Sequence, residues 1–162
     1  MIAVVGHGDL TAQALALLES ELRSRLAAFA KAGRAGLVRA GQGLPLAAGR
    51  AARAAGMALV TVLPSKAGLP VMPWSSDHKA AGELLMLSER VRLLEFDPAD
   101  PESCVHADES LLRACARVLA VWDGSPPNSW DPTAHLVAFA RARGIKVDVL
   151  WPSGATRTPR MA

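Results

Sequence analysis

The sequence VRAGQGLPLAAGRAARAAGMALVTVLPS (residues 38–65) contains a strand–helix–strand unit. Its first residues belong to a short strand candidate, 36–39, which ends at the glycine-containing turn 40–43. Pro45 suits the first turn of a helix, and Gly56 ends the alanine-rich segment that follows. Residues 57–63 then form an apolar run rich in β-branched side chains. Two strands joined by one helix in this way lie parallel in the same sheet.

The same alternation extends in both directions from this unit. We expect further strands at 2–5, 92–96, 118–122 and 146–150, and helices at 11–33, 45–55, 77–90, 100–116 and 131–143. The strands are short, nearly continuous apolar runs, which is typical of a sheet covered on both faces. The pattern predicts an α/β fold, a single-domain doubly wound and mostly parallel sheet of Rossmann-like type.

The boundaries of the domain follow from the same pattern. We expect one domain over residues 1–157 and a loose C-terminal tail over 158–162. Residues 64–77 contain three prolines and predict a long loop, either a lid or a connector. Asp100 and Asp131 each precede a proline, and both are interpreted as helix N-caps.

Composition excludes several classes of protein. Apolar residues make up 51% and charged residues 20% of the chain, which excludes a disordered chain. The net charge is only +3, and no run of Lys or Arg concentrates it, so we expect no nucleic-acid partner. No apolar stretch reaches the roughly 18 residues of a membrane span, and no secretory signal is visible. We therefore expect a cytoplasmic protein without a membrane partner.

The two cysteines, Cys104 and Cys115, fit neither a zinc pair nor a redox CxxC motif. We interpret them as small buried side chains in a reducing compartment. Spacings of Cys, His and carboxylates nowhere predict a metal site, and we expect no resident cofactor.

Three loops are expected to meet where ligands bind in such sheets, outside the carboxyl ends of the strands. They are Gly6–Asp9, Gly41–Gly43 and Asp123–Thr133. The glycines of the first two loops allow close backbone approach, and a helix N-terminus behind them offers free N–H groups to a phosphate. The alternative is that these glycines only form tight turns, because neither loop is a GxGxxG or GxxxxGK[ST] motif.

Three segments resemble motifs of the SLOG superfamily, the Rossmann-like nucleotide-binding domains related to the DNA-processing protein DprA and the LOG cytokinin-activating hydrolases. Residues 38–65 resemble its strand, small-Gly-x-Gly turn, helix, Gly, apolar strand and Pro. IAVVGHGDL (2–10) is similar to the first strand and its Gly-His turn. Residues 115–157 resemble the last motif, a buried strand ending in Asp-Gly and then a Thr at a helix start.

The resemblance implies that the chain binds a nucleotide or nucleotide derivative at the carboxyl edge, as a sensor or carrier module. Together with the glycine pattern it places these residues in the site: Gly6, His7, Gly8, Gly41, Gln42, Gly43, Asp123, Gly124 and Thr133. The phosphoribohydrolase branch has a Gly-Gly-x-Gly-Thr turn followed by a glutamate, whereas residues 128–133 here read NSWDPT. This departure favours binding. Hydrolysis of the base–ribose bond by an N-glycosidase remains the alternative, as does an interaction protein without a ligand.

Several of these side chains have two interpretations. Asp123 is suited to ribose hydroxyls, whereas Asp9 is more simply a helix cap, and Asp77 belongs to a polar cluster at a helix start. If the protein is an enzyme, Asp123, Asp9 and Asp77 are weak candidates for the acid or base. His7 either contacts the ligand or is a hydrogen-bonded turn residue.

Two tryptophans, Trp74 and Trp130, lie in the loops that are expected at the ligand edge. They could stack on a base or pack beneath their loops. The sequence leaves a homo-oligomer open as a further partner.

Overall fold

The computed structural model describes residues 1–71 and 75–159, without the side chains of 75–77. The seven strands are β1 (Ile2–Gly6), β2 (Gly36–Arg39), β3 (Leu59–Lys66), β4 (Leu69–Pro70), β5 (Arg90–Glu95), β6 (Arg117–Val121) and β7 (Lys146–Leu150). The five helices are α1 (Ala12–Lys31), α2 (Leu44–Ala54), α3 (Ser75–Leu87), α4 (Pro101–Arg113) and α5 (Thr133–Ala142). Apart from β4, which directly follows β3, strands and helices alternate along the chain as the sequence predicts.

The strands form one mostly parallel sheet. Its parallel strands follow the order β5-β3-β2-β1-β6-β7, and β4 pairs antiparallel with the end of β3. Ile2 of β1 pairs with Gly36 of β2 on one side and with Arg117 of β6 on the other. The chain thus builds outward from β1 in one direction and then returns to build in the other. The strand order reverses between β1 and β6, which is where ligands bind in open parallel sheets.

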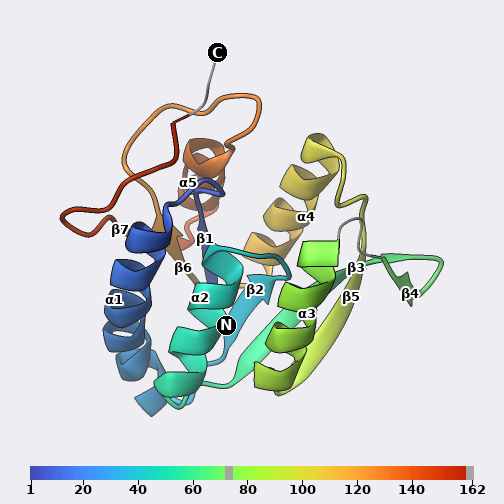
Figure 1. Ribbon diagram of the computed structural model, residues 1–162, viewed down its shortest axis with the longest axis horizontal. Coiled ribbons are helices and arrows are strands. Elements are labelled where there is room, and N and C mark those ends of the chain that lie inside the picture. The colour runs from blue at the N-terminus through green and yellow to red at the C-terminus, as the bar shows by residue number, and fades with distance from the viewer. Residues whose placement is uncertain (72–74, 160–162) are drawn as a thin grey trace.

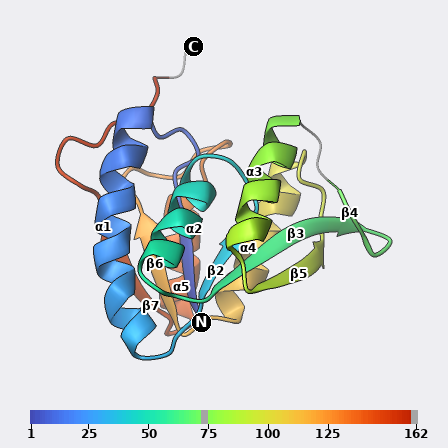
Figure 2. The ribbon, with the colours of Figure 1, turned by 60° about the horizontal axis from the view of Figure 1, so that its bottom comes forward.

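Helices cover both faces of the sheet, as Figures 1 and 2 show. On one face α1, α2 and α3 bury a core that includes Leu18, Leu22 and Leu84. On the other face α4 and α5 bury a second core with Leu112 and Leu136. The predicted doubly wound, Rossmann-like fold is confirmed.

Residues 64–71 and 75–77 differ from the long loop that the prolines predict at 64–77, and residues 72–74 lie outside the described part. β3 continues to Lys66, and a two-residue turn at Ala67 and Gly68 leads into β4. Both turn residues have positive φ, 53° and 78°, which suits the twist of a tight hairpin. The hairpin projects from the body of the molecule (Figure 2). The prolines therefore predicted a loop where a strand is present, because β4 is a short edge strand that tolerates Pro70.

Two further features bear on the sequence predictions. Cys115 is buried as expected, but Cys104 on α4 is partly exposed, and both are free thiols. Within the described residues, no helix has the length and apolar character needed to cross a membrane.

Candidate functional site

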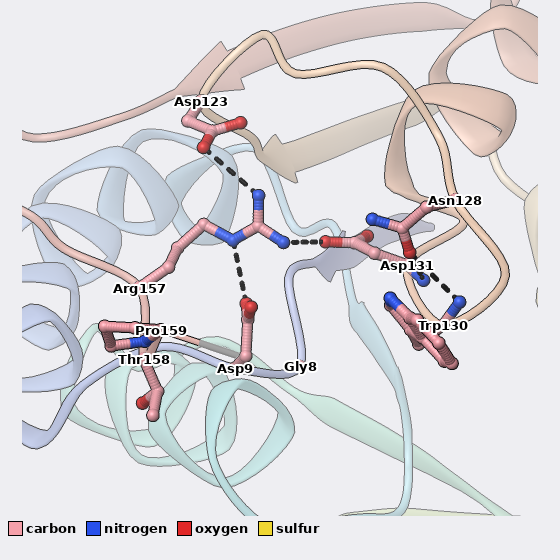
Figure 3. A pocket seen from close by; sticks show the side chains of 9 residues that line it. All are labelled: Gly8, Asp9, Asp123, Asn128, Trp130, Asp131, Arg157, Thr158 and Pro159. Atoms are coloured by element: carbon pink, nitrogen blue, oxygen red, sulfur yellow. Dashed lines mark hydrogen bonds and ion pairs between the residues drawn. The ribbon is translucent and has the colours of Figure 1, made fainter. Parts of the chain in front are cut away.

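The candidate site lies at the carboxyl ends of β1 and β6, where the strand order reverses. β1 leads directly into His7, and β6 leads to Asp123. The chain returns to this edge after β7, where the N–H of Thr158 donates to the carbonyl of Asp9 at 2.7 Å. Figure 3 shows how the loops from these three places converge.

His7 joins the loops that follow the two strands. Its side chain is 1% exposed. Nε2 lies 3.1 Å from the backbone nitrogen of Asp123 and 3.1 Å from its Oδ1, and Nδ1 forms a hydrogen bond with Asp131 Oδ2 at 2.5 Å. The ring also meets Trp151 edge-on, with 5.7 Å between the ring centroids. Through these contacts His7 connects the loop after β1 to the loop after β6.

Arg157, which the sequence analysis did not single out, is the centre of the cluster. Its Nε donates to Asp9 Oδ1 at 2.9 Å, and its Nη2 donates to Asp131 Oδ2 at 2.6 Å. Its Nη1 donates to Asp123 Oδ2 at 3.2 Å and to Ser125 Oγ at 3.1 Å. The hydrogen bond to Asp9, followed by that to Asp123, raises the pKa of the guanidinium. One arginine thus connects three carboxylates from two loops, the loop after β1 and the loop between β6 and α5.

The surroundings keep two of these carboxylates ionised. Burial acts to raise the pKa of Asp123, but hydrogen bonds from Ser125 and Arg157 outweigh it and hold that pKa well below its usual range. Burial also acts against ionisation of Asp131. Hydrogen bonds from His7 and Thr133 again outweigh it and lower the pKa of Asp131. Both groups are acceptors at neutral pH.

The structure corrects two of the three cap assignments. Asp9 is not the cap of α1, because Thr11 holds that position and accepts from the N–H of Ala14 at 3.1 Å. Pro132, not Asp131, is the N-cap residue of α5. Asp131 instead accepts from both the backbone N–H and the hydroxyl of Thr133, and it is committed to the ionic cluster. The third assignment, Asp100 as the cap of α4, is confirmed.

The glycines of the first two loops have different surroundings. A Cβ on Gly6 would lie 2.5 Å from the carbonyl oxygen of Val121, so strand packing itself requires this glycine. A Cβ on Gly8 would meet nothing within 4 Å. Gly43 has φ 74° and ψ −124° and is the N-cap residue of α2 without any side-chain cap.

A cavity of about 330 Å³, here called the glycine-loop cavity, lies beside these loops. Gly8, Gly41, Gln42 and Leu44 are among the residues that line it. The N-terminus of α2 therefore opens toward a space that a small molecule could occupy.

A second cavity of about 620 Å³, the acidic cavity, lies between Asp9, Arg157 and Trp130. Figure 3 shows Trp130 across Gly8 from the arginine cluster. The side chain of Trp130 is 61% exposed and lines the glycine-loop cavity as well. Both cavities thus share Gly8 and Trp130.

The remaining residues that the sequence predicts for the site either do not line the two cavities or lie outside the described residues. Gly124 has φ 88° and open space around it, and Thr133 is buried with its hydroxyl bonded to Asp131. Trp74 and the side chain of Asp77 fall outside the described residues.

One group of side chains has the spacing of metal ligands. His7, Asp9 and Asp131 each offer one potential ligand atom, and these three atoms lie within 4.8 Å of one another. Arg157 already supplies a positive charge to both carboxylates of this group.

Comparisons with known proteins find a structural likeness. No family model and no curated protein matches the sequence. Among solved structures, the molybdenum cofactor carrier protein from Chlamydomonas reinhardtii is similar, with a TM-score of 0.58 and 20% sequence identity. The match covers 93% of this chain and 76% of the other. At this identity the likeness supports the α/β fold.

Proposed function

We propose that this protein binds a phosphorylated small molecule, a nucleotide or nucleotide derivative, at the carboxyl edge of its sheet and acts as a carrier or sensor. The observation that carries the proposal is the open N-terminus of α2. The first N–H groups of a helix have no intrahelical partners and attract anions. Gly43 brings no side chain to cap them, and the first turn contains no acidic residue to compete with a phosphate.

Two resemblances support a binding role. The structurally similar protein from Chlamydomonas carries a small-molecule cofactor. The SLOG-like motifs at 2–10, 38–65 and 115–157 contain residues that line the two cavities, among them Gly8, Gly41 and Trp130. We extend the carrier role of the first and the nucleotide binding of the second to this chain as a proposal, because fold alone does not determine function.

Binding is favoured over hydrolysis of a base–ribose bond. A hydrolase of that kind needs a group that can protonate the leaving base. Asp123 and Asp131 have lowered pKa values and carry no proton at neutral pH. Asp9 is ion-paired with Arg157. The carboxylates at this edge are therefore suited to accept hydrogen bonds.

The proposal is tested by thermal unfolding with AMP, GMP, GDP, inorganic pyrophosphate and the molybdenum cofactor. A ligand at one hundred times its Kd stabilises the folded state by about 2.7 kcal/mol. For a chain of this size that corresponds to a rise in Tm of about 5–10 °C.

The matched variants are Gly8→Val and Gly82→Val. A Cβ at either glycine meets nothing within 4 Å, and neither has a positive φ, so both variants should fold. Gly43 is less suitable because its positive φ makes any side chain strained. We expect Gly8→Val to abolish the ligand-dependent rise in Tm and Gly82→Val to retain it. The proposal fails if no probe stabilises the wild type, or if Gly8→Val responds as the wild type does.

A further inference from the structure

We infer that the acidic cavity receives the ring of the ligand and selects a ring with two adjacent N–H donors, the 2-amino-4-oxopyrimidine edge that guanine shares with pterins. The inference rests on the proposed function, since it assumes that the phosphate lies at the glycine loop. Gly8 and Trp130 line both cavities, so a single ligand can extend from one into the other.

The charge of the acidic cavity determines which end of the ligand it accepts. Its lining includes three carboxylates, Asp9, Asp123 and Asp131, against the single guanidinium of Arg157. The carboxylates outnumber the guanidinium, so the cavity repels a phosphate and attracts N–H donors. The α2 N-terminus has the opposite preference. The two cavities together therefore orient a ligand that has one anionic and one donor-rich end.

Asp9 offers the acceptor that remains open. Asp131 accepts on both oxygens, from His7, Arg157 and Thr133. Asp9 accepts one hydrogen bond, from Arg157 on Oδ1, and within residues 1–71 and 75–159 no hydrogen bond to its Oδ2 is found. Each carboxylate oxygen has two lone pairs, so Oδ2 and Oδ1 together can accept from two adjacent N–H donors. Its side chain is 25% exposed, in the wall of the cavity.

Asn128 and Trp130 offer two further contacts to such a ring, an amide donor and an aromatic side chain. The Oδ1 atom of Asn128 accepts from the backbone N–H groups of Trp130 at 3.0 Å and Asp131 at 2.8 Å. These bonds fix which end of the amide is oxygen and leave the NH₂ group to donate to a ring carbonyl. Trp130 is largely exposed in the wall of this cavity, where its indole ring can stack on an aromatic ring.

The test compares GMP with IMP, which lacks only the 2-amino group. Isothermal titration calorimetry of the wild type should give a Kd for GMP at least about tenfold lower than for IMP, because a hydrogen bond to a charged group is lost with IMP. Asp9→Asn should reduce this preference to less than about threefold. The control Asp148→Asn removes a carboxylate that pairs with Arg117 away from the cavities, and it should retain the preference.

A second variant keeps the test decisive if Asp9→Asn does not fold. Asn128→Asp preserves an acceptor for the two N–H groups but removes the amide donor. It should weaken GMP and IMP by a similar factor, since both rings carry the carbonyl. Neopterin monophosphate distinguishes the source of the ring: tighter binding than GMP identifies a pterin, and weaker binding a guanine.

The outcomes separate this inference from the proposed function. Equal affinity of the wild type for GMP and IMP, with both lost in Gly8→Val, overturns the ring selection and leaves the binding site in place. No binding of GMP, IMP or neopterin monophosphate overturns the ring selection, and the proposed function fails as well only if AMP, GDP, inorganic pyrophosphate and the molybdenum cofactor also leave the Tm of the wild type unchanged.

Discussion

Replacing Arg157 by Met should destabilise the protein far more than replacing an ordinary surface arginine. Arg157 is 21% exposed and forms ion pairs with Asp9, Asp123 and Asp131. Met preserves much of the aliphatic contact and removes only the charge and its donors. The substitution would leave three carboxylates close together without the guanidinium that they share.

The size of the effect follows from the exposure of these groups. A partly exposed ion pair contributes about 0.2–1 kcal/mol after solvent screening. Three such pairs, one of them to the buried carboxylate of Asp131, give a loss of about 2–3 kcal/mol. At about 2–4 °C per kcal/mol for a chain of this size, the Tm should fall by about 4–12 °C.

The loss should also depend on pH in a defined direction. Folding lowers the pKa of Asp123 and Asp131 below the ordinary value of 3.8, so their contribution to stability is complete above that pH and is lost progressively as pH falls from there toward the lower pKa of the folded state. Arg157→Met removes part of that contribution. The free-energy difference between wild type and variant should therefore be largest near neutral pH and shrink below about pH 4.

Urea denaturation between pH 3 and pH 7 measures both effects. Arg117→Met is the control, because Arg117 is 22% exposed but pairs with one carboxylate, Asp148. Its loss should stay below about 1 kcal/mol. The reasoning is refuted if Arg157→Met unfolds at the same urea concentration as Arg117→Met, or if the difference from wild type grows as the pH falls.

Three further predictions concern the site. Gly6→Ala should lower the free energy of unfolding by about 1–3 kcal/mol because its Cβ would collide with Val121, whereas Gly8→Ala should change it by less than about 0.5 kcal/mol; urea denaturation of the pair checks this. Trp130→Ala should leave stability within about 0.5 kcal/mol yet weaken GMP binding about 10- to 100-fold by calorimetry, and unchanged affinity would argue against stacking. Incubation with AMP should release no adenine by chromatography, and multiple turnovers would favour the glycosidase alternative.

The sequence was informative wherever local patterns determine local structure. The apolar run at 57–63 and the turn before Pro45 predicted β3 and α2 because strand burial and helix starts depend on neighbouring residues. The same reasoning placed the three loops at one edge of the sheet. It failed at Ala67 and Gly68, since this turn is not one of the strong hairpin dipeptides.

The chemistry of the site was harder to predict. Asp9 and Asp131 precede helices and were interpreted as caps, yet their carboxylates bond to Arg157, which is distant in sequence. No local signal distinguishes Arg157 from other arginines of the chain. Only the three-dimensional fold shows that the segment after β7 returns to the loop after β1.

The bond between Asp9 and Arg157 spans 148 residues of sequence, and this has a consequence for the order of folding. Closing so long a loop carries a large entropic cost, and contacts of this separation form slowly. The β1–β5 portion can pair while residue 157 is still being synthesised, but the ionic cluster cannot. We therefore expect helix content to recover early in refolding and ligand binding to recover last, so that binding reports completion of the whole fold.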